Sequence, residues 1–233
     1  MKLAIITPTY RKLDGSTYFH LAAALDSVKK QTHTDYKLFL IGDDYSDHSE
    51  FLKLSTILEP INIYAENLEV AKERIKYSGY DLWRNGGVNA SNIGIKKALD
   101  EGYDYICHLD HDDLFLPNHL SLISECIDRT YAPFITTKCG DYPPIDTDTL
   151  YTKYRPETNR LFKVSTCVNY NYFKMFFRNM LEETGKSYAA DADMWNRIKT
   201  FLEERDEYGI FINRVTTKRN GGGTTYKNPE IVK

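Results

Sequence analysis

The sequence contains little cysteine, and its four cysteines form no short motif. None lies in a CxxC arrangement, which argues against a zinc site or a redox-active dithiol. Three of the four lie in apolar runs, so we expect reduced, buried core residues and a cytoplasmic location, where thiols stay reduced. The four cysteines are Cys107, Cys126, Cys139 and Cys167.

A strong charge of either sign is also missing. The formal net charge is -3 and the pI is about 6.1, and the lysines and arginines are scattered along the chain. A nucleic-acid-binding surface would need clustered basic residues, so we expect no nucleic-acid partner.

Long apolar runs are absent as well. The first apolar run ends at Pro8, which is too short for the core of a signal peptide, and no run is long enough to span a bilayer. We therefore expect no transmembrane segment and at most a peripheral contact with a membrane. Nothing in the pattern indicates an oligomeric state.

What the sequence does contain is a regular alternation of apolar, strand-like runs with segments of helical period. This alternation predicts an α/β fold, a single Rossmann-like domain over residues 1–233 with a mostly parallel central sheet flanked by helices. We expect strands at 3–7, 36–41, 61–64, 105–109, 134–138, 161–168 and 210–215. We expect helices at 19–31, 51–58, 89–100, 119–128, 171–181 and 191–204, a long loop at 140–159, and an irregular tail from 218.

An acidic cluster follows the strand predicted at 105–109. Asp110, Asp112 and Asp113 place three carboxylates within four positions, and carboxylates this close repel one another unless a cation lies between them. Oxygen ligands without a thiolate favour Mg²⁺ or Mn²⁺, ions that also bind phosphate oxygens. A nucleotide or another phosphate compound is therefore the expected ligand. The alternative is an acidic turn that caps the helix predicted at 119–128.

Polar residues follow two further predicted strands. In an open α/β sheet, ligands bind where the strands end at their carboxyl edge, so residues 7–11, 42–47 and the acidic cluster should converge. Tyr10 offers an aromatic face for a base, and the carboxylates of Asp43 and Asp44 can accept from base N–H groups or ribose hydroxyls. The plainer alternatives are a packed tyrosine and a pair of turn residues.

A glycine pair at 86–87 precedes the helix predicted at 89–100. Glycines permit a tight turn, and the first N–H groups of the helix could then meet an anion. Such pairs are also common in ordinary turns, so this feature alone is weak.

Taken in order, these segments resemble family 2 of the inverting nucleotide-sugar glycosyltransferases, which have the GT-A fold. Residues 5–10 match the family's opening strand and Pro-Thr-Tyr turn, and residues 43–47 match its Asp-Asp-Gly-Ser turn. Residues 85–94 match its Asn-Gly-Gly segment and following helix, and residues 109–113 match its DxD motif. The resemblance covers most of the chain, from 3 to about 225.

The resemblance implies roles for the matching residues. Tyr10 would flank the base, and Asp44 with Asp43 would hold the base or the ribose. Asp110 would face the ribose or a metal-bound water, and Asp112 would coordinate a Mn²⁺ or Mg²⁺ ion that bridges the diphosphate. The implied nucleotide-sugar contacts are Thr7, Pro8, Thr9, Tyr10, Arg11, Asp43, Asp44, Asn85, Gly86, Asn92, Asp110 and His111.

The resemblance also implies a catalytic base. Residues 190–197 are similar to the family's acidic segment with an aromatic residue on a helix, and Asp191 falls on the position of the base. Asp191 would take the proton of the acceptor hydroxyl, so that a single displacement inverts the anomeric carbon. By residue type, Asp191 equally suits a helix N-cap.

The implied reaction moves a sugar from a nucleoside-diphosphate sugar to a hydroxyl. The expected donor is a UDP- or dTDP-sugar, and the expected acceptor is a glycan or glycolipid. Residues 1–115 would bind the donor, and residues 116–233 would bind the acceptor.

The sequence departs from the family in several places. Ser91 stands where many relatives have an arginine, so a cationic contact to the diphosphate would be lost or would come from Arg11 or Lys138. Residues 65–84 look inserted, and their apolar residues suggest an extra short helix.

Two more departures concern the catalytic machinery. Ala190 replaces the acid that usually precedes the base, and Asn220 replaces a histidine, which weakens the case for a third metal ligand. These departures leave a catalytically inactive sugar-nucleotide-binding protein as one alternative. A metal-dependent phosphoesterase built on the His-rich acidic cluster is another, although it would need further histidine and aspartate ligands elsewhere.

Overall fold

A computed structural model describes the chain except for residues 13, 46–47, 57–61, 141–142, 159 and 220–233. Over the described residues, nine strands form one sheet. The strands are β1 (Leu3–Thr9), β2 (Tyr36–Asp43), β3 (Ile63–Leu68), β4 (Tyr105–His108), β5 (Asp113–Phe115), β6 (Phe134–Cys139), β7 (Tyr151–Tyr154), β8 (Thr166–Asn169) and β9 (Gly209–Arg219).

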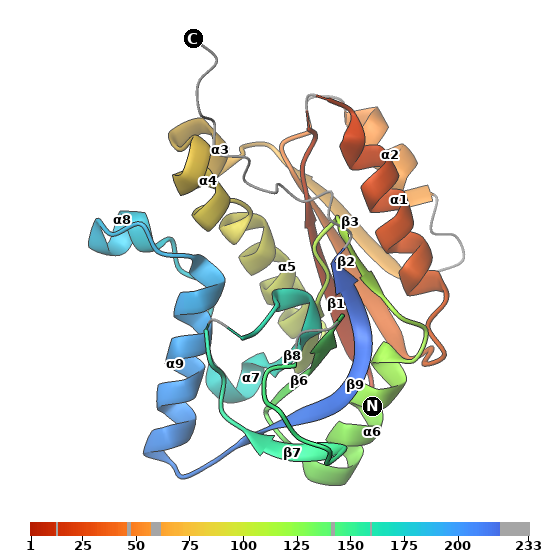
Figure 1. Ribbon diagram of the computed structural model, residues 1–233. Coiled ribbons are helices and arrows are strands. Elements are labelled where there is room, and N and C mark those ends of the chain that lie inside the picture. Colours follow the sequence, from red (N-terminus) through yellow and green to blue (C-terminus); the bar gives the residue numbers. More distant parts are fainter. Residues whose placement is uncertain (13, 46–47, 57–61, 141–142, 159, 220–233) are drawn as a thin grey trace.

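Helices lie on both faces of this sheet (Figure 1). They are α1 (Ser16–Lys29), α2 (His48–Thr56), α3 (Lys72–Lys76), α4 (Gly79–Asn85), α5 (Val88–Asp100), α6 (His119–Thr130), α7 (Tyr170–Phe173), α8 (Met180–Thr184) and α9 (Ala190–Glu204), with a 3₁₀ turn η1 (Lys163–Ser165). The architecture is the single α/β domain that the sequence predicts.

The sheet order is β3-β2-β1-β4-β8-β6-β9-β5, and β7 also pairs with β9. The strands from β3 to β4 in this order are parallel, as expected for strands joined by crossover helices. Beyond them β8 runs antiparallel to both β4 and β6, while β6 and β9 are again parallel. The short strands β5 and β7 both run antiparallel to β9.

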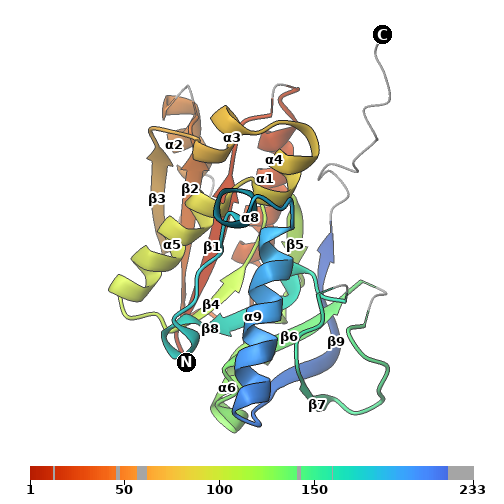
Figure 2. The same ribbon diagram turned by 90° about the vertical axis from the view of Figure 1, so that its left-hand side faces the viewer.

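The sheet has a separate hydrophobic core on each face. Ile5 of β1 packs into the core under α1 and α6, and its neighbour Ile6 packs into the core under α5 and α9. Figure 2 shows α5 and α9 together over the second face. Because both faces are covered, these strands are apolar without alternation, which explains the runs in the sequence.

Helix α5 packs against the sheet through a glycine. A Cβ atom on Gly94 would lie 2.9 Å from Cγ2 of Ile6 and 3.1 Å from Cγ1 of Ile41. Glycine therefore allows α5 to lie close to β1 and β2, and the start of α5 is held at the carboxyl edge of the sheet.

Some element boundaries differ from those predicted. Pro8 was expected to end the first strand, but β1 continues to Thr9. Pro8 and Thr9 pair only with β2, because β4 pairs with Ala4 to Ile6, so no sheet hydrogen bond is needed from the missing proline N–H. The irregular tail was also expected to start at Lys218, but Lys218 belongs to β9.

The prediction was least accurate between residues 140 and 181. The expected loop at 140–159 contains β7, and the strand expected at 161–168 is divided into η1 and β8. The helix expected at 171–181 is two short helices, α7 and α8, because Lys174 at the end of α7 takes a left-handed conformation with φ 51°. The three-residue strand β5 was not expected.

The four cysteines are buried and free, as predicted. Within the described ranges, no helix is both long and apolar enough to cross a membrane.

Candidate functional site

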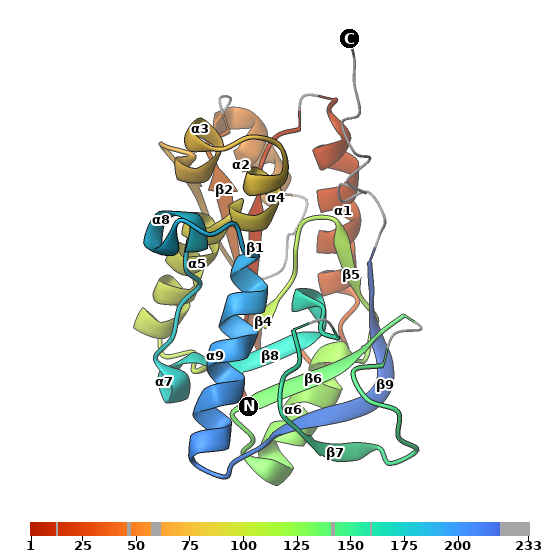
Figure 3. The same cartoon turned by 60° about the vertical axis from the view of Figure 1, so that its left-hand side comes forward.

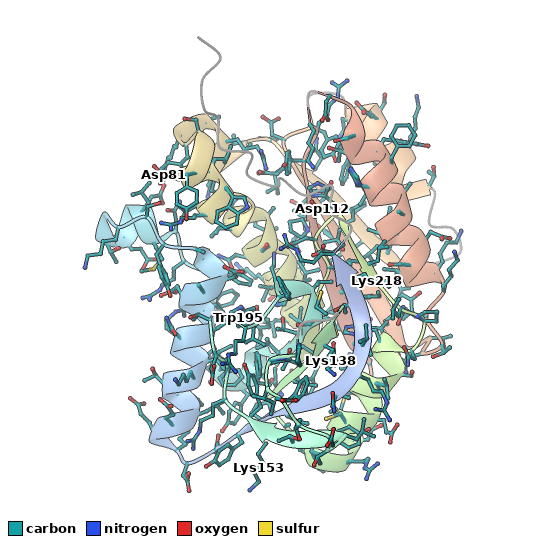
Figure 4. All side chains as sticks on the ribbon, in the orientation of Figure 1. Asp81, Asp112, Lys138, Lys153, Trp195 and Lys218 are labelled. Carbon is teal, nitrogen blue, oxygen red and sulfur yellow. The ribbon has the colours of Figure 1, made fainter. Side chains whose placement is uncertain are left out.

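The three strand ends expected to converge do so around a cavity of about 530 Å³. Thr9 and Tyr10 follow or end β1, Asp43 ends β2, and Asp110 and Asp112 follow β4, and all five line this cavity. Asp112, labelled in Figure 4, shows where the cavity lies at the carboxyl edge of the sheet. The cavity is also lined by Pro8, Gly86, Gly87, Val88, His111 and Asp191.

One end of the cavity is built from Tyr10, Asp43 and Arg74. Nε of Arg74, on α3, donates to Oδ2 of Asp43 at 3.0 Å, and its guanidinium carbon lies 3.3 Å from the centre of the Tyr10 ring. Asp43 is only 2% exposed, and its Oδ1 has no hydrogen-bond partner among the described residues. Burial raises the pKa of Asp43, and Arg74 opposes this effect. This end therefore offers an acceptor and a donor side by side.

His111 packs against Tyr10. The two rings meet edge to face, with centroids 5.0 Å apart and planes at 88°. His111 is buried, and burial lowers its pKa, so the imidazole is neutral at neutral pH. Tyr10 thus contacts both Arg74 and His111 and also lines the cavity.

The centre of the cavity holds an ion pair that the sequence did not predict. Nζ of Lys163, in η1, lies 2.8 Å from Oδ1 of Asp110, and the Lys163 side chain is 16% exposed. Burial alone would raise the pKa of Asp110, but Lys163 and the adjacent histidines outweigh it and hold that pKa below its usual value. Asp110 is therefore ionised at neutral pH.

Lys163 also supplies a cation beside Ser91. Its Nζ lies 3.4 Å from Oγ of Ser91, the position at which related sequences were expected to carry arginine. Arg11 pairs with Glu50 at 3.1 Å and does not line the cavity, and Lys138 lies apart from Asp112 in Figure 4. The structure places Lys163 at this point instead of Arg11 or Lys138.

The antiparallel strand β8 explains how Lys163 reaches Asp110. β8 runs beside β4 with Cys107 opposite Cys167, so the segment before β8 lies next to the segment after β4. Lys163 precedes β8 and Asp110 follows β4, which brings the two side chains together.

Asp191 lies in the first turn of α9 and lines the same cavity. The N-cap residue is Ala189, so the cap alternative for Asp191 does not hold, although its Oδ1 accepts a hydrogen bond from the N–H of Ala192 at 2.8 Å. Burial raises the pKa of Asp191, Asp110 raises it further, and the Ala192 N–H and Lys163 lower it. A carboxylate with a raised pKa is a stronger base than an ordinary aspartate.

The start of α9 is held by a second carboxylate. Asp193 accepts from Arg178 at 2.7 and 3.1 Å and from Nε of Arg197 at 2.8 Å, and its side chain is 8% exposed. These bonds join α9 to the segment between α7 and α8, and they fix the position of Asp191 two residues earlier.

Asp112 is the residue best placed to hold a divalent cation. Across the described part of the chain, no group of three histidine, cysteine, aspartate or glutamate side chains gathers into a complete metal site, and Asp110 is engaged by Lys163. Mg²⁺ and Mn²⁺ are commonly bound by one or two carboxylates together with phosphate oxygens. The residues therefore fit a cation shared with a bound diphosphate. Asn220 lies outside the described residues.

Two residues that were expected to contact the nucleotide sugar instead form hydrogen bonds within the protein. The side-chain amide of Asn92 donates to the backbone oxygen of Phe177 at 2.8 Å and accepts from its N–H at 3.0 Å. Nδ2 of Asn85 donates to the backbone oxygen of Asp81 at 3.0 Å, and Asn85 is fully buried. Neither residue lines the cavity.

The start of α5 already meets a carboxyl group from the chain. Oε1 of Glu73, on α3, accepts from the backbone N–H of Asn89 at 3.0 Å. Glu73 is buried, and burial raises its pKa. The helix N-terminus therefore binds a glutamate where the sequence suggested an external anion.

Three other expected contacts lie away from the cavity lining. Thr7 is buried within β1, Arg11 is paired with Glu50, and Asp44 is exposed with φ 58°. The structure thus separates Asp43, which lines the cavity, from its neighbour Asp44, which does not.

The apparent insertion at 65–84 contributes directly to the site. β3 extends to Leu68, and the rest forms the two short helices α3 and α4, where a single short helix was expected. Arg74 on α3 and Trp83 on α4 both line the cavity. No motif marks either residue, so no signal in the sequence would have identified them.

The chain is similar in sequence to several known proteins. The sequence model of Glycosyl transferase family 2 matches residues 4–185. An uncharacterised glycosyltransferase of Acanthamoeba polyphaga mimivirus, R139, is 29% identical over 242 residues that cover 96% of each chain. The Escherichia coli UDP-Glc:α-D-GlcNAc-diphosphoundecaprenol β-1,3-glucosyltransferase WfgD is 25% identical over 152 residues, which cover 65% of this chain and 50% of WfgD.

Solved structures show the same fold. S. aureus TarS 1–349 in complex with UDP has a TM-score of 0.65 at 14% sequence identity, covering 94% of this chain and 60% of that chain. The mannosyltransferase PcManGT from Pyrobaculum calidifontis, in complex with GDP-Man and Mn²⁺, has a TM-score of 0.61 at 14% identity, covering 97% and 58%. The architecture is therefore that of the GT-A glycosyltransferases, and this chain spans 60% or less of these two longer chains.

Proposed function

The chain belongs to glycosyltransferase family 2, and we propose that its cavity binds a nucleoside-diphosphate sugar and transfers the sugar, with inversion, to an acceptor hydroxyl. The observation that supports this most is the meeting of Tyr10, Asp43, Asp112 and Asp191 around one cavity of about 530 Å³. That volume is within the usual range for a small-molecule site.

The nucleoside would bind at Tyr10, Asp43 and Arg74. Asp43 has an unpartnered acceptor oxygen beside the donor groups of Arg74. Uracil and thymine present the complementary pair, N3–H and O4, and guanine presents a similar pair, N1–H and O6, whereas cytosine carries no proton on N3. The UDP-Glc donor named for WfgD and the UDP bound to TarS favour a UDP- or dTDP-sugar over a GDP-sugar.

Asp112 would hold a Mn²⁺ or Mg²⁺ ion together with the diphosphate. When bound, such an ion neutralises negative charge on the leaving diphosphate. The Mn²⁺ in the PcManGT complex supports this assignment.

The sugar would lie between the pair Asp110–Lys163 and Asp191. Ionised Asp110 can accept hydrogen bonds from hydroxyls of the ribose or the sugar. Asp191 would take the proton from the acceptor hydroxyl as its oxygen attacks the anomeric carbon and the bond to the diphosphate breaks. The raised pKa of Asp191 suits it to this step.

Calorimetry of UDP binding tests the nucleotide assignment. Wild-type protein should bind UDP in the presence of Mn²⁺. Its UDP affinity should be roughly tenfold or more weaker when a chelator replaces the metal. Asp43→Asn removes a charged acceptor from a buried site and should weaken UDP and UDP-sugars alike by about tenfold or more.

Asp44→Asn is the matched control, since Asp44 is the exposed neighbour outside the cavity. Its UDP affinity should stay within about twofold of wild type. Equal UDP affinity with metal and with chelator would exclude the role of the cation, and equal affinity in the two variants would exclude Asp43 as the base-reading residue.

A further inference from the structure

An exposed aromatic pair lies on α4 at the wall of the cavity. The rings of Tyr80 and Trp83 are stacked, with centroids 5.5 Å apart and planes at 14°. Tyr80 is 42% exposed and Trp83 is 50% exposed, and Trp83 lines the cavity. The other tryptophan, Trp195, is completely buried in the core. A large apolar ring left open beside a polar cavity is a surface on which a ligand can stack.

This aromatic pair is held in place from two sides. The guanidinium of Arg84 lies 4.0 Å from the Tyr80 ring centre, and its Nη2 donates to the Tyr80 hydroxyl at 2.6 Å. Arg84 also donates from Nη1 to the backbone oxygen of Ser187, and the Ser187 hydroxyl bonds to Asp81 on α4. These bonds hold α4 and the Tyr80 ring on which Trp83 stacks, and an ordered platform reduces the entropy lost on binding.

The same bonds set the position of the pair relative to Asp191. Ser187 lies a few residues before Asp191, so α4 is joined to the segment that leads into α9. Figure 3 shows α4 above the N-terminal end of α9, with α8 beside it. The wall next to Asp191 consists of Ala189 and Ala190, whose small side chains leave room for a ligand.

We propose that Trp83, backed by Tyr80, is the acceptor subsite and stacks against the apolar face of a hexopyranose ring. This inference rests on the proposed function, because it takes Asp191 as the base that the acceptor hydroxyl must reach. A pyranose ring such as a β-glucoside presents axial C–H groups on one face, and these pack against an indole ring. An acyclic polyol has no such face. The acceptor class is therefore a glycan that ends in a pyranose ring.

Fluorescence of Trp83 provides the test. The emission of Trp83 is the difference between wild type and Trp83→Phe, because Trp195 is buried and common to both. Methyl β-D-glucopyranoside is the probe and ribitol is the acyclic control, each titrated with and without UDP and Mn²⁺. The glucoside should change the Trp83 emission saturably, and ribitol should not.

Variants separate stacking from a general surface effect. Trp83→Ala should weaken glucoside binding, measured by ligand-observed NMR, about tenfold, and Trp83→Phe should weaken it less because a ring remains. UDP affinity should not change in either variant. Phe19→Ala removes an exposed aromatic ring on α1, 74% exposed and outside the cavity lining, and should behave as wild type.

Three outcomes would each overturn the inference. The first is unchanged Trp83 emission with the glucoside, and the second is equal glucoside binding by Trp83→Ala and Phe19→Ala. The third is a loss of UDP affinity in Trp83→Ala as large as the loss of glucoside affinity, which would assign Trp83 to the nucleotide. Failure of wild type to bind UDP contradicts the proposed function instead, and the glucoside titration without nucleotide still decides the role of Trp83.

Discussion

Lys163 connects the two carboxylates on which the proposed chemistry depends. Its ammonium lies 2.8 Å from Asp110 and lowers the pKa of both Asp110 and Asp191. Burial and the Asp110 carboxylate raise the pKa of Asp191. They outweigh Lys163, so the pKa of Asp191 is raised overall. Lys163 thus limits the rise in the pKa of Asp191, and it keeps Asp110 ionised.

Lys163→Met should move the acidic limb of the pH profile of kcat/KM to higher pH. Removing the ammonium destabilises the ionised form of Asp191, so its pKa rises, and a larger part of the base is protonated at a given pH. The rate of UDP release with donor and acceptor, measured across the acidic range, checks this. Lys138→Met removes a lysine outside the cavity lining and should leave the limb in place. A limb that stays in place or moves to lower pH in Lys163→Met would contradict the assignment.

Some of these residues could be predicted from the sequence and others could not, for physical reasons. Asp43 and Asp110 could be predicted because each stands where a buried, apolar strand ends. Arg74 and Lys163 could not, because nothing in an expected short helix or an expected strand marks them as site residues, and they reach the site only through tertiary packing. Asn92 was predicted to bind nucleotide, but an amide can equally bond to the backbone, and here it bonds to Phe177.

At the scale of elements, the position of Asp191, the proposed base, depends on where α9 begins. Asp193 ties the first turns of α9 to Arg178 and Arg197. Burial would raise the pKa of Asp193, but the two arginines outweigh it and hold that pKa below its ordinary value of 3.8. A carboxyl whose pKa is lowered by folding stabilises the native state above its unfolded pKa, and that contribution is lost as the pH falls through the folded pKa.

Asp193→Asn should lower the free energy of unfolding at neutral pH by about 1–3 kcal/mol, because two arginines lose a buried, charged partner. The difference from wild type should shrink as the pH falls below 3.8, where the unfolded chain is protonated at Asp193, and should be lost once the pH also passes the lower pKa of the folded state. Urea unfolding at several pH values measures both effects.

Asp206→Asn serves as the control, because Asp206 is 91% exposed and its pair with Arg155 is screened by solvent. It should change stability little at any pH. Equal losses in the two variants would show that Asp193 does not anchor α9.

The elements themselves were predicted unevenly. Strands such as β1 and helices such as α5 have long apolar patterns that decide their type. β7, only Tyr151–Tyr154, is a short edge strand whose pairing with β9 comes from the fold and not from its own sequence. The break between α7 and α8 depends on the left-handed Lys174, a conformation that residue type does not indicate.

At the scale of the whole molecule, the cavity lies where several distant parts of the chain meet. The parallel strands supply Tyr10, Asp43 and Asp112, and α3 and α4 of the apparent insertion cover them. β8 and α9 bring in Lys163 and Asp191 from the second half of the chain. The sequence predicted the first group well, because parallel strands must end at one edge of the sheet. It could not predict how the second half folds back over that edge.

The central claim is that this cavity transfers a sugar with Asp191 as the base. The most direct measurement is the rate of sugar transfer by wild type and Asp191→Asn, with UDP-sugar donors and Mn²⁺, and with UDP affinity and the anomeric configuration of the product determined on the same preparations. Wild type should transfer with inversion, and Asp191→Asn should be slower by roughly 10²-fold or more at unchanged UDP affinity, since asparagine keeps the shape and loses the basicity. A retained configuration, or an asparagine variant that transfers at nearly the wild-type rate, would contradict this account.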